Sequence, residues 1–70
     1  MNIKMLKNKI ATSGMTMVSI AAKTGILRET LYNRLNENGE FKASEIAALA
    51  SVLRLSRDEV DEIFFDKIVN

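Results

Sequence analysis

Side chains that commonly carry enzyme chemistry are scarce in this chain. Its 70 residues include no histidine and no cysteine, which removes the most common general base, the thiol nucleophile, disulfides and ordinary zinc ligands. The carboxylates lie on predicted exposed helix faces and do not converge in a recognisable cleft. We therefore expect no catalytic activity, no cofactor and no small-molecule substrate.

Charged side chains can instead bind a polyanion, and they are unevenly distributed. Residues 1–36 hold six basic residues and one acidic residue, whereas residues 37–70 hold four basic and eight acidic ones, although the net charge is only +1. The first half could therefore face nucleic acid. The alternative is a set of solvated helix faces whose asymmetry is accidental.

The elements that must position these charges are predicted from the apolar pattern and from one glycine. Apolar residues recur at helical spacing on both sides of Gly25, where glycine would destabilise a continuous helix by about 1 kcal/mol relative to alanine. We predict two short helices instead, of which the first has Thr16 as its N-cap and ends at Gly25. The second runs from about Arg28 to Asn36, and the small side chain of Ala21 would let it approach the first closely.

Three further helices complete the prediction, and no segment has the alternating pattern of a strand. One covers about residues 3–12, the next runs over residues 43–53, and a capping box of Ser56 and Glu59 opens the last. Phe41 would return the chain to the core after a polar loop. This predicts an all-α fold, a compact five-helix arrangement in a single domain over residues 1–70.

The same patterns separate core from surface. We expect Phe64 in the core, whereas Phe65 lies off the apolar stripe and could pack beneath the C-terminal tail or contact a partner. On the helix over 43–53, three polar side chains are expected to point to water: Glu45, Ser51 and Arg54.

The N-terminal residues lack the apolar run of a signal peptide, and no apolar stretch of the 18 or more residues needed for a membrane span occurs. We expect a cytoplasmic protein without a membrane partner. So short a chain buries a limited core, so that either well-packed helices or a partner chain must help to stabilise it. A homodimer is one such possibility.

The stretch TMVSIAAKTGILRETLYNRLN, residues 16–36, resembles the helix-turn-helix of the phage repressor and Cro family. It has a small residue at Ala21, glycine four positions later at Gly25, and apolar residues at Ile26 and Leu31. The following residues, 33–65, are similar to small phage and prophage Cro-like regulators. The resemblance implies a domain of the phage repressor DNA-binding type, in which the second and third helices form the helix-turn-helix.

The resemblance also implies which side chains meet DNA. Base edges would be read from the third helix by Leu27, Arg28, Glu29, Tyr32 and Asn33. Arg28 suits guanine and Asn33 suits adenine, each through two hydrogen bonds, while Glu29 could accept from cytosine and Leu27 could pack on a thymine methyl group. Phosphate contacts are implied for Thr16, Lys23, Asn36 and Lys42.

One position departs from the family. Many members carry a glutamine at the first residue of the second helix, where it braces the phosphate backbone, and this chain has Met17 there. Methionine cannot donate that hydrogen bond, and with Met15 beside it the corner is apolar. Such a corner could weaken DNA binding, mark a protein contact, or fill gaps in the core.

The resemblance implies two functions. The first is a Cro-like transcriptional regulator of a lysis/lysogeny switch that binds a double-stranded DNA operator. The alternative is a modulator of repression, or antirepressor, which forms a complex with the phage repressor protein, as small modulators from phages of Gram-positive hosts do. Its contact residues would be Met15, Met17, Arg28, Tyr32 and Phe65. An antidote of a toxin–antitoxin pair carrying the same motif is a more distant possibility.

Overall fold

Every regular element in the computed structural model, which describes residues 1–66, is a helix. The five helices are α1 (Ile3–Thr12), α2 (Met17–Thr24), α3 (Arg28–Leu35), α4 (Ala43–Leu53) and α5 (Arg57–Phe64). The predicted all-helical, five-helix fold is therefore confirmed over this range. The expected boundaries also hold closely, since α3 ends one residue before the predicted Asn36.

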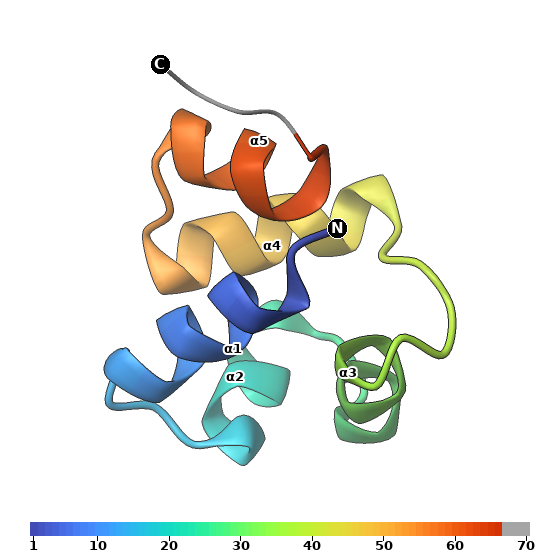
Figure 1. The fold of residues 1–70 in the computed structure, drawn as a ribbon. Helices are drawn as coiled ribbons and strands as arrows, with labels where there is room; N and C mark the ends of the chain where they lie inside the picture. The colour runs from blue at the N-terminus through green and yellow to red at the C-terminus, as the bar shows by residue number, and fades with distance from the viewer. Residues whose placement is uncertain (67–70) are drawn as a thin grey trace.

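In Figure 1, α4 and α5 pack together in the upper part of the molecule, while α2 and α3 lie in the lower part. The two parts are joined because α2 packs directly against α4, and α1 packs against α5. The first two residues contact the end of α5. The backbone N–H of Asn2 donates to the carbonyl oxygen of Ile63 (2.6 Å), and the terminal ammonium of Met1 pairs with the carboxylate of Asp66 (2.6 Å). The start of the chain is thus held against the end of α5.

All five helices contribute to one apolar core, and no polar or charged residue is buried among residues 1–66. Two core residues lie outside helices: Ile26 in the turn after α2 and Phe41 in the loop before α4. Phe41 contacts Phe64 edge to face, with ring centroids 5.6 Å apart, an arrangement that aromatic rings favour. The buried set is Leu6, Ile20, Ile26, Leu31, Leu35, Phe41, Leu49, Ile63 and Phe64.

The ends of α2 are formed as the sequence predicts. The Thr16 hydroxyl accepts the backbone N–H of Ser19 (3.1 Å), which satisfies a donor that the first turn leaves free. Gly25 ends the helix in the left-handed conformation, with φ 75°, and its N–H donates to Ala21 (2.9 Å). A Cβ atom at Gly25 would meet nothing within 4 Å, so the position requires glycine for its backbone conformation and not for space.

The end of α4 uses the same conformation without a glycine. Arg54 has φ 55°, and the next amide, of Leu55, donates to Ala50 (2.9 Å). Side chains other than glycine adopt this region only at an energetic cost of about 1–2 kcal/mol. Nothing in the sequence around Arg54 predicts this strained helix end.

Glu45 contradicts the expectation that it points to water. Its side chain is 14% exposed, and its Oε1 accepts the backbone N–H of Lys42 (2.8 Å) while lying 3.8 Å from Nε of Arg34. The physical reason is its place in the first turn of α4, where a carboxylate folds back to cap the helix start. Ser51 and Arg54 are exposed as expected.

The predicted capping box of α5 is present and extends into an ion pair. The Ser56 hydroxyl accepts the N–H of Glu59 (3.1 Å), and Oε1 of Glu59 accepts the N–H of Ser56 (2.8 Å). The other carboxylate oxygen of Glu59 pairs with Lys9 of α1. Lys9 foremost, followed by the Ser56 amide, lowers the pKa of Glu59.

Substitutions at the two left-handed helix ends should have opposite effects. We expect Gly25→Ala to lower the free energy of unfolding by about 1 kcal/mol, because alanine is strained at positive φ. Arg54→Gly should raise it by about 0.5 kcal/mol, since glycine removes that strain at a modest entropic cost. Urea unfolding followed by circular dichroism measures both, and an unchanged midpoint for Gly25→Ala would contradict the left-handed turn.

The lowered pKa of Glu59 predicts an acid-sensitive contribution to stability. The folded protein binds this proton less tightly than the unfolded chain, so the Lys9 contact stabilises the fold above the unfolded-state pKa of Glu59. That contribution is lost as the pH falls through the lower folded-state pKa. In urea unfolding from neutral to acidic pH, the parent should lose more stability than Glu59→Gln, and parallel pH profiles would refute this assignment.

Candidate nucleic-acid interface

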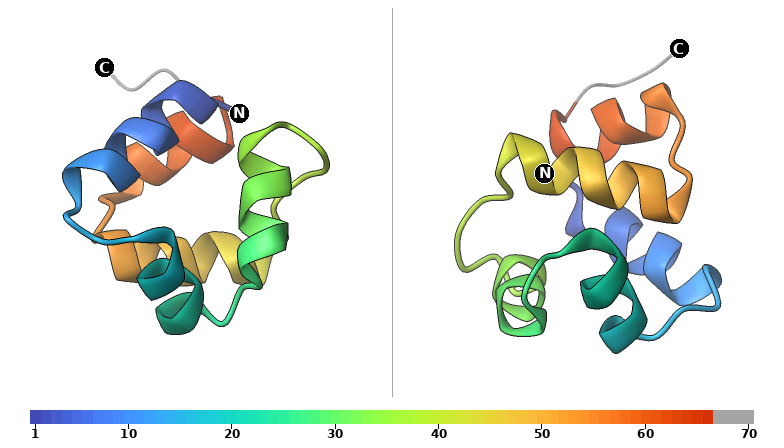
Figure 2. Two further views of the ribbon diagram at one scale, coloured as in Figure 1. Left: turned by 90° about the horizontal axis from the view of Figure 1, so that it is seen from below. Right: turned by 180° about the vertical axis from the view of Figure 1, so that it is seen from behind.

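The eight residues of α3 separate into a buried and an exposed face. Leu31 and Leu35 pack into the core, whereas the predicted base-reading residues all lie on the exposed side. The helix forms one edge of the molecule when it is seen from below (Figure 2). Positions four apart on a helix are neighbours on its surface, so the structure brings the predicted residues together in two adjacent rows, with Leu27 at the helix start: Arg28 with Tyr32, and Glu29 with Asn33.

The charged groups of this face are free of ion pairs within the described part of the chain. Each ion pair found there lies elsewhere, joining Met1 to Asp66, Lys9 to Glu59, and Arg34 to Glu45. Arg28 and Glu29 are consequently presented to solvent without a charged partner from residues 1–66. Such groups keep their full hydrogen-bonding capacity for a ligand.

Large apolar side chains interrupt this charged face. Leu27 is 74% exposed and Tyr32 is 49% exposed, although burial would be favourable for both. Leu27 is also the N-cap of α3 and offers no side-chain hydrogen bond to the helix. The face therefore combines hydrogen-bonding groups with apolar surface that an occupant could cover.

The four predicted phosphate contacts all lie at exposed helix ends. Thr16 and Lys23 are at opposite ends of α2, roughly 10 Å apart along the helix axis at 1.5 Å per residue, so they do not form one cluster. Asn36 ends α3 and Lys42 begins α4. Lys42 and Leu27 line the same surface depression, which places one phosphate candidate beside the start of α3.

The predicted partner-contact residues do not form a single surface. Met15 and Met17 are half-buried and pack against the core. Their position agrees better with methionines that fill gaps in the core than with an open apolar corner that contacts a partner. Phe65 is 55% exposed after α5, in the upper half of Figure 1, whereas α2 and α3 lie in the lower half. Only Arg28 and Tyr32 of that set share the α3 face.

Val18 is an exposed apolar residue outside the predicted sites. It lies in the first turn of α2 and is 57% exposed. The exposed Ala22 comes one helical turn later on the same side. Because Ile20 is buried, helical spacing places Val18 and Ala22 on the opposite side of α2, and this spacing could have predicted their exposure.

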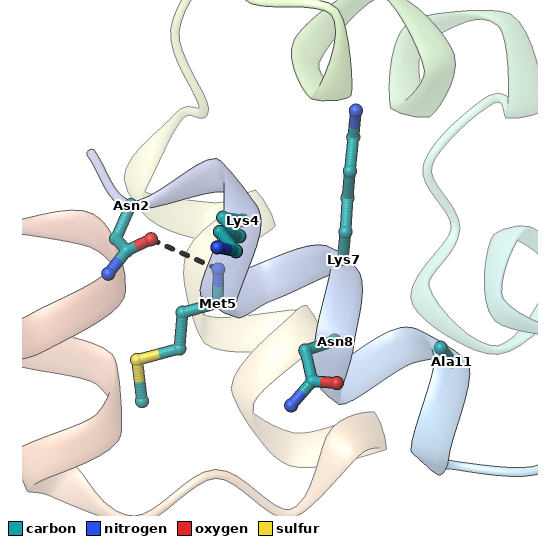
Figure 3. A pocket seen from close by; sticks show the side chains of 6 residues that line it. All are labelled: Asn2, Lys4, Met5, Lys7, Asn8 and Ala11. Carbon is teal, nitrogen blue, oxygen red and sulfur yellow. Dashed lines mark hydrogen bonds between the residues drawn. The ribbon is translucent and has the colours of Figure 1, made fainter.

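A second surface feature lies on α1, where two lysines flank a shallow pocket (Figure 3). All of its lining residues come from Asn2 and α1, and the Asn2 side chain is engaged in capping that helix by accepting the N–H of Met5 (3.0 Å). Lys7 extends away from α1 and lines a neighbouring hollow together with Glu37. Lys4 and Lys7 share that hollow with two acidic residues, Glu37 and Asp66, and do not form an enclosed site.

Metal-binding clusters and membrane-spanning helices are both absent from residues 1–66. No group of three or more histidine, cysteine, aspartate or glutamate residues there is arranged to hold a metal ion. None of the five helices combines the length and the apolar character that crossing a membrane requires. Comparison with protein-family models, curated proteins and solved structures found no match to this chain.

Proposed function

We propose that this chain is a Cro-like regulator of a phage lysis/lysogeny switch, which binds operator DNA through a helix-turn-helix formed by α2 and α3. The observation that carries the proposal is the exposed face of α3, where Arg28, Glu29 and Asn33 stand free of ion pairs with residues 1–66. Arginine, asparagine and carboxylate side chains are the groups that hydrogen bond to base edges in the major groove.

The base contacts are assigned from the chemistry of each side chain. The Arg28 guanidinium can donate two hydrogen bonds to guanine O6 and N7, and the Asn33 amide can pair with adenine N6 and N7. Glu29 can accept from cytosine N4. The exposed Leu27 would lose water against a thymine methyl group, which offsets its unfavourable exposure in the free protein.

Helix ends on either side of α3 supply the phosphate contacts in this proposal. Lys23 and Lys42 provide positive charge, and the Thr16 hydroxyl can still donate its proton outward because it accepts from Ser19. These contacts fix orientation and register without reading sequence. The buried Leu31 and Leu35 hold α3 against the core, so a recognition helix would be presented on a stable support.

A second candidate function is favoured by the apolar side chains on the same face. Leu27 and Tyr32 are exposed beside Arg28, and tyrosine and arginine are enriched where the binding energy of protein interfaces is concentrated. We therefore retain, as an alternative, a modulator of repression that binds the phage repressor with this face. DNA and repressor would then compete for one surface.

The regulator proposal predicts different effects for base-reading and phosphate-contacting residues. Arg28→Ala and Asn33→Ala should each weaken binding to a selected DNA site by about 1–3 kcal/mol, with less effect on random DNA. Lys23→Ala should weaken both alike and reduce the slope of log affinity against log salt by about 0.9. Fluorescence anisotropy on a site selected by the parent protein from a random pool measures this, with Ser51→Ala of α4 as the control. Equal losses for all three variants on every DNA would show that none of them reads bases.

The modulator alternative predicts exclusive binding on the α3 face. Tyr32→Ala should weaken affinity for the phage repressor by at least about 1 kcal/mol, because it removes a large anchor from the centre of the interface, whereas Ser51→Ala should change it little. Titration calorimetry of the repressor with each variant, without and with saturating DNA, measures both properties. Unchanged affinity of Tyr32→Ala, or equal affinity for the DNA-saturated parent, would rule out a shared face.

A further inference from the structure

The loop over residues 36–42 joins α3 to α4, and its two ends carry proposed phosphate contacts, Asn36 and Lys42. Two of its residues have positive φ, Glu37 at 63° and Gly39 at 102°. Its early part is tied back to α3, since the amide of Glu37 donates to Arg34 (3.0 Å) and that of Asn38 to Asn33 (2.8 Å). The later part has a different support.

That support is the side chain of Arg34, which reaches from the last turn of α3 into the loop. Its Nη1 donates a long hydrogen bond to the carbonyl of Asn38 (3.4 Å), and its Nε lies 3.8 Å from Oε1 of Glu45. A Cβ atom at Gly39 would lie 2.7 Å from Nη1. Gly39 therefore leaves the space that the guanidinium occupies.

Glu45 connects this arginine to Lys42. The same carboxylate oxygen that faces Arg34 also accepts the backbone N–H of Lys42 (2.8 Å). One oxygen atom thus links the last turn of α3 to the residue that begins α4. We refer to Arg34, Gly39 and Glu45 as the loop clamp.

The energetics of the clamp favour a positioning role over a purely stabilising one. Its two charged side chains are only 19% and 14% exposed, so each has lost most of its hydration, and such pairs contribute little net stability. Nε of Arg34 is buried without a hydrogen-bond partner within the described residues, which carries a further cost. The arrangement does, however, supply a defined distance between α3 and the start of α4.

We propose that Arg34 and Glu45 are positioning residues for DNA binding, which hold Lys42 in register with the base-reading face of α3. The inference rests on the proposed function, because it needs a phosphate contact at Lys42. Neither clamp side chain touches DNA in this account. Their effect is exerted through the backbone position of Lys42.

The test removes the arginine and compares it with a matched ion pair elsewhere. Arg34→Met keeps an apolar stem without the guanidinium, and Lys9→Met breaks the pair between α1 and α5, whose side chains are 33% and 26% exposed. Arg34→Met should weaken binding to selected and random DNA alike by at least about threefold and lower the salt slope by about 0.9. Lys9→Met should leave both unchanged.

A double-mutant cycle separates positioning from a general loss of stability. If the clamp acts through Lys42, Arg34→Met should have little further effect in a Lys42→Ala background, because the contact that it positions is already absent. Full additivity of the two losses would overturn the proposal. So would a Lys9→Met loss as large as that of Arg34→Met.

Hydrogen exchange tests the clamp without DNA. The backbone N–H of Lys42 donates to Glu45, so Arg34→Met should speed its exchange relative to the parent and to Lys9→Met. Glu45→Gln keeps an acceptor oxygen and should therefore speed this exchange less. Unchanged exchange in Arg34→Met would refute the clamp itself. A parent protein that binds no DNA, with faster exchange in Arg34→Met, would instead refute the proposed function and the phosphate role while leaving the clamp in place. The two failures are therefore distinguishable.

Discussion

The structure depends on one apolar core that five short helices must build together. The helices have 8 to 11 residues each, and isolated helices of this length are marginal in water. Each is held by the residues it buries, from Leu6 of α1 to Phe64 of α5, and the core includes Ile26 and Phe41 from the connecting segments. Loss of any one helix would expose apolar surface on its neighbours, so the arrangement of α3 relative to α2 is determined by the whole core.

Elements governed by local rules could be predicted from the sequence. Thr16, Gly25 and Ser56 mark helix ends through contacts made within a few residues, and all three act in the structure as expected. The left-handed Arg54 could not be predicted in this way, because nothing in its side chain favours positive φ. Its conformation is set by the hydrogen bonds that end α4, among them the one from the Leu55 amide to Ala50.

The exposed face of α3 could also be predicted from local rules, whereas contacts between residues distant in the chain could not. Leu31 and Leu35 fix which side of α3 faces the core, so the exposed side could be deduced from helical spacing alone. Burial of Met15 and Met17 depends on neighbours distant in the chain, and long flexible side chains give no pattern that distinguishes a core position from a surface one. The approach of Arg34 to Glu45 spans a loop with two left-handed residues, and its course could not be derived from spacing.

The distribution of charge explains how a chain of net charge +1 could bind a polyanion as proposed. Lys23, Arg28 and Lys42 lie on or beside α2 and α3, whereas exposed acidic residues such as Asp58 and Glu62 belong to α5 in the other half of the molecule (Figure 1). The division is partial, because exposed Glu37 and Glu40 follow α3, and exposed Arg54 and Arg57 lie at the end of α4 and the start of α5. In the proposed complex, the acidic residues of α5 would lie away from the DNA, so that the charge beside α3 matters more than the net charge of the chain.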